Sequence, residues 1–537
     1  MTAQDLASSA PPAAGPVRAR RAWPPLALIT LSTAVALALA VPLVFLIIEA
    51  SGAGLGHVID LIARPLTAQL LWNTVQLTIA VTVLCAIIGT GAAWLVERTA
   101  LPGRRIWAVL LVVPLAIPDF VVSFGWASLW NWVHGFRGAV LVMTLAVYPL
   151  VYLPVAASLR AADPSQEEVA RSLGVGRVKT FVRITLGQAR GAILGGCLLV
   201  ALVLLAEYGA FELLGFQTFT TEIFTEFNLS FSVPAACALS LVLVVLSLLV
   251  LAGEGMARGR GQAARLGAGA PRVIPPLRLG RATWPAVAAI TALVLLALGV
   301  PVASGIYWIF AGGAASITGG SVSMLNAAWH TAAYGVSAGV IDTLAALPVA
   351  LLAIRHTSRA RRFLERSTYL VLAMPGVVIG FSLAYFTERY AAGAGYQTAP
   401  LLVICYAIMF FPLALTGVKA AIARAPAGLD EMSRSLGLGR LATLRRVTLR
   451  LAGPGLAAAF CLVFLSVVTE LTATLLLIPT GMQTLATQFW QYETDGSYAQ
   501  AAPFALVMIA IAAVPSYVLG RFFDRSASAR NIDGKTT

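Results

Sequence analysis

The sequence predicts an all-α polytopic membrane protein of about 12 transmembrane helices in two parallel six-helix repeats. Three observations support this prediction: the composition, the spacing of long apolar runs, and an internal repeat. Of the 537 residues, 59% are hydrophobic and 11% are charged, against about 45–50% apolar and about 25% charged residues in soluble proteins. The net charge is +14, but the basic residues lie between apolar runs, which argues against nucleic-acid binding.

Twelve apolar runs are long enough to cross a bilayer, which takes about 20 residues of helix. Helices are expected because backbone polar groups inside the bilayer need partners within the chain. The expected spans of the first half are 26–49, 70–95, 106–131, 138–158, 190–212 and 233–252. Those of the second half are 284–310, 329–354, 367–388, 398–419, 455–478 and 502–520.

Basic residues indicate how the spans are oriented. If alternate loops are assigned to one side, starting with the N-terminus, 34 of the 37 Lys and Arg residues fall on that side. Only Arg64, Arg137 and Arg389 fall opposite. Because basic loops stay in the cytoplasm, both termini are expected there. The five cysteines are dispersed along the apolar runs, and we expect them to pack between helices.

Composition divides the chain into five parts. A disordered cytoplasmic tail is expected at 1–22, since the apolar run that follows is too long for a cleaved signal peptide. Six-helix halves are expected at 23–252 and 283–520. The segment 253–282 between them is rich in Gly, Pro and Arg, which is typical of a surface linker. A second cytoplasmic tail is expected at 521–537.

An internal repeat relates the two halves. The stretch Glu168–Leu186 returns as Glu431–Leu449 at an offset of 263, with eleven of nineteen residues identical. The same offset pairs Glu207 with Glu470, and an offset of 257 upstream pairs Pro118 with Pro375 and Asn73-Thr74 with His330-Thr331. The halves therefore share one topology, and both copies of the repeated stretch face the cytoplasm.

Each copy is expected to form a helix–turn–helix hairpin. Gly174 and Gly437 follow the first helix and suit a left-handed C-terminal cap. The first helix carries two apolar residues four apart, Val169 and Leu173 in one copy and Met432 and Leu436 in the other. Basic loops resting on anionic lipid would explain the arginines. They would not explain the repeated Glu, Gly and Arg spacing, which favours docking of a pseudosymmetric partner.

The hairpins resemble the EAA loop of permease subunits of binding-protein-dependent ABC importers. That pattern is E-A-A, three residues, G, nine residues, I, one residue and L-P. The matching residues are Glu168, Ala170, Gly174, Ile184 and Leu186 in the first copy, and Glu431, Gly437, Val447 and Leu449 in the second. Gly187 and Arg450 stand where the pattern has Pro, and Met432 and Ser433 replace the two alanines.

The resemblance implies a type I ABC importer permease in a bacterial inner membrane. Each hairpin would insert into a cytoplasmic ABC ATPase subunit, so two copies of that subunit are expected. A periplasmic or lipid-anchored binding protein would deliver the cargo. The sequence contains no G-x-x-x-x-G-K-[ST] phosphate loop. We therefore expect no catalytic site and no bound cofactor, with ATP used by the partner subunits; membrane lipid is the remaining partner.

Five acidic residues are candidates on the substrate side. Glu207 and Glu470 are expected to line the substrate path, because ionisable residues in spans default to function; packing or interfacial carboxylates are the alternative. Glu212, Glu222 and Glu226 form a candidate docking loop for the binding protein. The His and Cys residues are scattered, so no metal ligands are assigned.

The format most resembles ferric iron permeases, whose cargo is a hard cation suited to oxygen ligands. Thiamine, aminoethylphosphonate and polyamine importers share the architecture and stay as alternatives. An ion-coupled 12-helix secondary transporter also has two six-helix halves, but it would not need the repeated hairpin. A membrane-embedded enzyme would need clustered intramembrane catalytic groups, which the sequence lacks.

Overall fold

The computed structural model describes residues 26–52, 55–162, 165–228, 233–258, 277–313, 321–356, 359–390, 395–425 and 427–513. Within these ranges the chain is helical, without strands, and has one isolated backbone bridge, between Thr99 and Leu277. The expected tails at 1–22 and 521–537 lie outside the described residues, as does most of the linker. The expected all-α membrane architecture is confirmed.

Nine helical segments of the described ranges are long and apolar enough to cross a membrane. In the first half these are α1 (Leu26–Gly52), α3 (Pro65–Arg98), α6 with α7 (Gly135–Val147 and Pro149–Ala161), α10 (Leu186–Ala206) and α13 (Val233–Arg258). In the second half these are α14 with α15 (Thr283–Val294 and Val300–Gly312), α17 (Ser321–Arg355), α20 (Ala399–Ala423) and α23 (Leu449–Val468).

Two expected spans, 106–131 and 367–388, are sharply broken rather than continuous. The segment Arg104–Ala116, which begins with α4 (Arg104–Leu110), meets α5 (Asp119–Ala127) at 92°. The segment Phe363–Ala373, which contains the end of α18 (Arg359–Thr368), meets α19 (Gly376–Tyr390) at 100°. The breaks fall at Pro118 and Pro375, because proline has no N–H and disfavours a helical residue before it. The bends themselves were not predicted from the sequence.

Other span ends also differ from expectation. The spans expected at 190–212 and 455–478 end at Ala206 and Val468. In each case the chain turns at a glutamate and continues as a short helix, α11 (Gly209–Leu213) or α24 (Thr472–Leu477). The last expected span, 502–520, corresponds to an apolar helix that runs from Tyr498 to the end of the described residues at Ala513.

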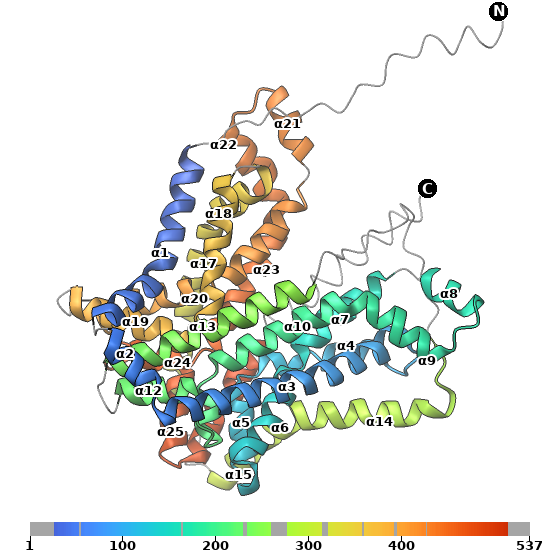
Figure 1. Cartoon of the computed structure of the whole chain (residues 1–537), viewed down its shortest axis with the longest axis horizontal. Helices are drawn as coiled ribbons and strands as arrows, with labels where there is room; N and C mark the ends of the chain where they lie inside the picture. The colour runs from blue at the N-terminus through green and yellow to red at the C-terminus, as the bar shows by residue number, and fades with distance from the viewer. Residues whose placement is uncertain are drawn as a thin grey trace, which may run out of the picture.

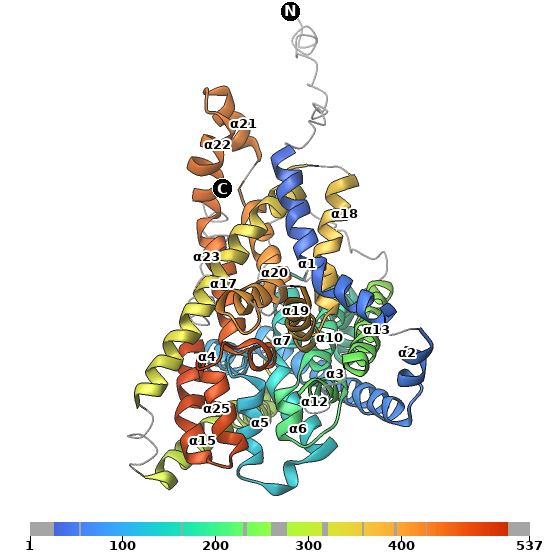
Figure 2. The ribbon, with the colours of Figure 1, turned by 90° about the vertical axis from the view of Figure 1, so that its left-hand side faces the viewer.

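The first helices are exchanged between the halves. Helix α1 packs against α17, α18 and α19 of the second half, and α15 packs against α5 of the first half (Figures 1 and 2). Buried apolar residues form two main clusters, each with members from both halves. Leu471 and Phe489 join the first-half cluster, and Leu205 and Phe219 join the second-half cluster. The two repeats therefore form one membrane unit.

The two hairpins lie at the ends of two diverging groups of helices. In Figure 1, α8 (Ser165–Ser172) and α9 (Arg177–Thr180) end one group, and α21 (Ala427–Ser435) and α22 (Arg440–Thr443) end the other. The groups converge around α12 (Phe219–Asn228), α24 and α25 (Leu485–Thr494). We call the side of the hairpins the hairpin end and the opposite side the convergent end.

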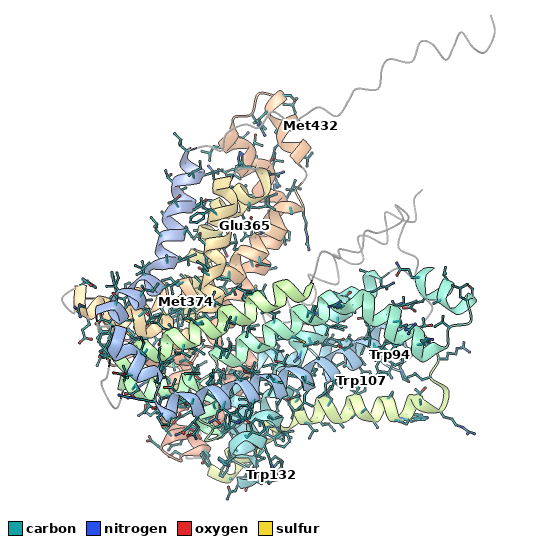
Figure 3. The ribbon with its side chains drawn as sticks, viewed as in Figure 1. Trp94, Trp107, Trp132, Glu365, Met374 and Met432 are labelled. Carbon is teal, nitrogen blue, oxygen red and sulfur yellow. The ribbon has the colours of Figure 1, made fainter. Side chains whose placement is uncertain are left out.

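Tryptophans mark both ends of the first half. Trp94 and Trp107 lie towards the hairpin end, and Trp132 lies at the convergent end (Figure 3). Trp132 is 63% exposed, and its amphipathic ring is typical of the membrane–water interface.

Helix α5 approaches α15 so closely that only glycine fits at the contact. A Cβ added to Gly125 would lie 2.7 Å from the Cα of Pro301. Small residues of this kind let membrane helices approach, which gains van der Waals contact where the hydrophobic effect contributes little. This contact holds the second half's first helix against the first half.

We expect Gly125→Val to lower the melting temperature of the detergent-solubilised protein, because the added carbons force α5 and α15 apart. Overpacking of this kind costs about 1–3 kcal/mol. Gly91→Val is the matched control, since a Cβ at Gly91 meets nothing within 4 Å. Equal melting temperatures for the two variants would contradict the assigned contact.

Candidate functional site

Both hairpins have the predicted left-handed turn. Gly174 has φ +78° and Gly437 has φ +87°. Beyond each glycine a backbone N–H closes the cap: Val175 donates to the carbonyl of Ala170 and Leu438 to that of Ser433, each at 3.0 Å. Neither glycine would be crowded by a Cβ, so the requirement for glycine is conformational. The turn predicted from the sequence is confirmed in both halves.

Each hairpin exposes the apolar pair of its first helix. Val169 and Leu173 are 57% and 76% exposed, and Met432 and Leu436 are 62% and 81% exposed. Figure 3 shows Met432 at the tip of the second hairpin. Exposed apolar side chains at a matched position in both halves are typical of a surface that binds a partner.

The other residues of the motif are placed as follows. Ala170 is buried, Glu431 is exposed, and Ile184, Leu186, Val447 and Leu449 are half-buried. The side chain of Glu168 lies outside the described residues. The motif residues of the second helix are therefore half-buried, whereas the first helix exposes most of its apolar pair and Glu431.

The second helix of each hairpin does not stand alone. After α9 and α22 the chain passes through a π-helical turn, Phe181–Thr185 or Leu444–Thr448, and continues into α10 or α23. The two π-turns are related by the offset of 263. No sequence pattern predicted them, because a π-turn forms where packing favours one extra residue in a helix.

An ion pair joins each hairpin to the end of a span. In the first half, Arg98 lies 3.3 Å from Glu167, and the Thr185 hydroxyl donates to the same carboxylate at 2.9 Å. Arg98 is the last residue of α3, and Thr185 ends the π-turn. The side chains of Arg98 and Glu167 are 7% and 12% exposed. We call these three residues the first clamp.

The second half repeats this arrangement. Arg355, the last residue of α17, lies 3.1 Å from Asp430, and Thr448 donates to that carboxylate at 2.9 Å. Arg355 and Asp430 are each 16% exposed. We call Arg355, Asp430 and Thr448 the second clamp. Sequence reasoning missed both clamps, although their arginines match at the offset of 257 and their acids at 263.

Glu207 and Glu470 occupy equivalent places where α10 and α23 end. Glu207 accepts a hydrogen bond from the backbone N–H of Ala210 at 2.8 Å, and Glu470 accepts one from Ala473 at 3.0 Å. Each carboxylate therefore caps a short helix, where its charge suits the helix N-terminus. The two carboxylates also lie close enough to interact electrostatically, and Asp119 lies near Glu207.

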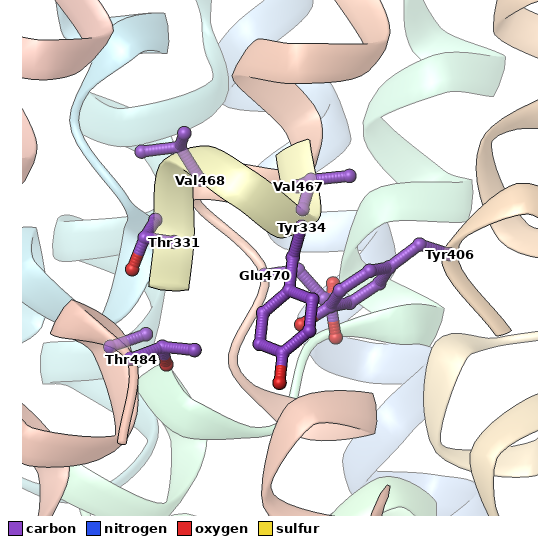
Figure 4. A pocket seen from close by; sticks show the side chains of 8 residues that line it. Thr331, Tyr334, Tyr406, Val467, Val468, Glu470 and Thr484 are labelled. Atoms are coloured by element: carbon purple, nitrogen blue, oxygen red, sulfur yellow. The ribbon is translucent and has the colours of Figure 1, made fainter. Parts of the chain in front are cut away.

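Glu470 also lines a narrow pocket in the second half (Figure 4). The lining residues are Thr331, Tyr334, Tyr406, Val467, Val468, Glu470, Thr484 and Ala486. The Tyr406 hydroxyl is 2.6 Å from that of Thr474, and the Tyr334 hydroxyl lies 3.2 Å from the sulfur of Met482. The repeat places Leu77 and Met143 where the second half has these tyrosines. The two tyrosine hydroxyls thus belong to the second half alone.

A repeated threonine motif forms the start of α12 and of α25. Sequence reasoning missed this motif. Gln217-Thr218-x-x-Thr221 returns as Gln483-Thr484-x-x-Thr487 at an offset of 266. In each copy the second Thr hydroxyl accepts the first Thr N–H at 2.9 Å, at the start of α12 or α25. The three-residue change of offset conceals the similarity from a search at 263.

The same threonine helices are tied to the long spans. Thr74 of α3 accepts the N–H of Phe219 at 3.4 Å, and Thr331 of α17 accepts that of Leu485 at 2.9 Å. These threonines are a pair that the offset of 257 relates in the sequence. Each half thus uses an early span to anchor its late helix at the convergent end.

The three glutamates of the candidate docking loop do not gather into a metal site. Glu212 lies on α11, and Glu222 and Glu226 lie on α12. Partial burial, together with the negative charge of Glu226, raises the pKa of Glu222. Among the described residues no group of three or more His, Cys, Asp or Glu side chains is arranged to hold a metal ion.

Comparison with known proteins relates both halves to one family. Residues 89–254 and 343–530 each match the model of the binding-protein-dependent transport system inner membrane component. The Fe(3+)-transport system permease protein FbpB 2 of Haemophilus influenzae is 36% identical over 501 residues, which are 93% of this chain and 99% of that protein. The ferric transport system permease protein FbpB of Actinobacillus pleuropneumoniae is 22% identical over 85% of this chain and 71% of its own length. The sulfate transport system permease protein CysW of Escherichia coli is 27% identical over 32% of this chain and 64% of its own length.

We expect Gly174→Ala to loosen the first hairpin, because a left-handed backbone costs a non-glycine residue roughly 1–2 kcal/mol. Hydrogen–deuterium exchange of the α8 amides should rise about tenfold, the equivalent of about 1.4 kcal/mol. Gly176→Ala is the matched control, because Gly176 has no left-handed backbone and open space around it. Equal exchange in both variants would contradict the conformational role of Gly174.

Proposed function

The chain belongs to the family of inner membrane components of binding-protein-dependent transport systems, and we propose that it is the permease of an ATP-driven ferric iron importer. The assignment of ferric iron as the cargo rests on the end-to-end similarity to a ferric permease, at 36% identity over 93% of this chain and 99% of that protein. A family match in each half supports a single chain that supplies both sides of the translocation path.

The hairpins are proposed to dock two copies of a cytoplasmic ABC ATPase. Each hairpin offers one exposed apolar pair on a short helix, and the two copies match in sequence and in geometry. One ATPase per hairpin follows from this duplication. The excess of Lys and Arg in alternate loops supports a cytoplasmic position for the hairpins and both termini. ATP is hydrolysed by the partners, since the sequence contains no phosphate loop.

The convergent end is proposed to receive a periplasmic or lipid-anchored binding protein. This end carries α11 and α12 with Glu212, Glu222 and Glu226. Negative side chains at such a surface steer a positively charged partner and define its register. Cargo released there would enter between the halves, near Glu207 and Glu470.

Glu207 and Glu470 are proposed to line the cargo path as well as to cap helices. They lie near each other at equivalent positions of the two halves. Glu207 follows the end of α10, and Glu470 follows the end of α23. Carboxylates are suitable ligands for a hard cation. The helix groups diverge towards the hairpin end (Figure 1), which is the geometry of a state open to the cytoplasm. Approach of the hairpins on ATP binding would close that side.

We expect a tagged chain, purified in mild detergent with its partners, to retain about two ATPase subunits per chain. Its ATP hydrolysis should rise when iron-loaded binding protein is added, and proteoliposomes should take up ⁵⁵Fe. Val169→Asp with Met432→Asp should release the ATPase, because a charge replaces the exposed apolar contact in both hairpins. Iron uptake driven by an ion gradient, without any ATPase, would contradict the proposal.

The two roles of Glu470 can be separated by substitution. In Glu470→Gln the amide oxygen can still accept the N–H of Ala473, so the melting temperature should stay near that of the parent while ⁵⁵Fe uptake falls about tenfold. Glu470→Ala should lower both, because the cap is also lost, at about 1 kcal/mol. Parental uptake in the glutamine variant would leave Glu470 with the capping role alone.

A further inference from the structure

The first helix of each hairpin has few neighbours. Helix α8 packs mainly against α9 and the π-turn Phe181–Thr185, and α21 packs mainly against α22 and the π-turn Leu444–Thr448. These neighbours belong to the same hairpin or its junction with the following span. A force applied to the exposed face of α8 or α21 therefore needs a further connection to reach the other helices of its half.

The clamps supply that connection. In both halves an arginine ends the long span α3 or α17, and its carboxylate partner is a residue of α8 or α21. The hydroxyl that completes each clamp comes from the end of the π-turn. Each clamp thus joins three elements at one carboxylate: an early span, the docking helix and the start of a late span.

The second clamp has an additional backbone contact. Arg355 also donates to the carbonyl of Ala425 at 2.9 Å, just before α21. Its guanidinium therefore holds both the entry to the docking helix and the carboxylate on it. Arginine suits this role because its planar group presents several donors in a fixed geometry.

The occurrence of the same contacts in both halves distinguishes the clamps from a chance ion pair. The acid is Glu in one half and Asp in the other, yet the Arg–carboxylate and Thr–carboxylate contacts occur in both. Low exposure strengthens these contacts, since water screens buried charges less than surface charges. Nearby, Glu97 and Arg160 form a pair at 3.3 Å that joins α3 to α7 without touching the hairpin, and Arg160 is 55% exposed.

We propose that Arg98 and Arg355 are positioning residues that transmit movement of the docking helices to α3 and α17. This inference rests on the proposed function, since the movement comes from the ATPase subunits. With both clamps intact, each hairpin, its early span and its late span move as one body. Without the arginines, the hairpins still bind the ATPase through their exposed apolar faces, but α3 and α17 no longer follow.

The test measures two distances in one complex. Spin labels at Ser172 and Ser435 report the hairpins, and labels at Ile87 and Leu344 report α3 and α17. Each pair occupies matching positions of the two repeats, and all four residues are exposed. The labels are introduced as cysteines into a chain in which the two partly exposed native cysteines, Cys197 and Cys461, are alanine.

In the parent complex, a non-hydrolysable ATP analogue should shift both distance distributions. In Arg98→Gln with Arg355→Gln the hairpin distance should still shift, while the span distance should stay at its nucleotide-free value. ATP hydrolysed per iron transported should then rise at least tenfold. Parallel shifts of both distances in the double variant, with an unchanged ATP-to-iron ratio, would overturn the proposal.

Two further variants separate transmission from folding. Arg160→Gln removes a neighbouring ion pair outside the hairpin and should leave both distance shifts at parental size. Arg98→Glu with Glu167→Arg reverses the first pair, and in the parent background it should retain the full span shift, which Arg98→Glu alone reduces because only α17 then follows its hairpin. Failure of the reversed pair to restore that shift, in protein that still binds ATPase, would count against the clamp.

The spin-label readout needs no cargo, so the two proposals can fail separately. A parent complex that carries no ⁵⁵Fe but shows both shifts would overturn the iron function and retain the clamp. A parent complex that transports iron, with spans that follow the hairpins even in the double arginine variant, would retain the function and overturn the clamp.

Discussion

The structure depends on one constraint of the membrane interior: a backbone that leaves its helix there must find hydrogen-bond partners within the protein. Four matched places meet this constraint. Where α10 and α23 end, Glu207 and Glu470 accept the N–H groups of the next short helix. Where α12 and α25 begin, Thr74 and Thr331 accept backbone N–H groups from across the half. Polar side chains therefore make the broken helices permissible.

The same constraint places polar chemistry where the two halves meet. A carboxylate that caps a helix in this region also leaves a charged or polar group beside the junction of the two halves. The capping and path interpretations of Glu207 and Glu470 are thus compatible, because one oxygen of a carboxylate can accept a backbone N–H while the group faces a passage. The second half adds Tyr334 and Tyr406 near Glu470, where the first half has Leu77 and Met143. Cargo would meet two unlike walls in spite of the repeat.

The hairpin end is not subject to this hydrogen-bonding constraint, because it lies outside the apolar core. There the helix ends carry exposed apolar pairs, which are the proposed docking surface, and largely buried ion pairs within the chain. Exchange of α1 and α15 joins the two halves, whereas the hairpins have few contacts beyond their own junctions. A unit joined at one end and divergent at the other can respond to a force at the hairpins by changing the angle between its halves.

The sequence by itself determined the features that depend on nearby residues. Apolar runs predicted most of the spans, and Gly174 and Gly437 predicted the left-handed turns, because both follow from local composition or backbone preference. Only the tertiary structure decided the exchange of first helices and the pairing of Arg98 with Glu167. These features depend on which distant segments meet, and residues as far apart as Arg355 and Asp430 show no local pattern. The repeat contained a signal for them, since matching positions recur at 257 and 263, but a shared offset identifies equivalent residues and does not say which of them touch.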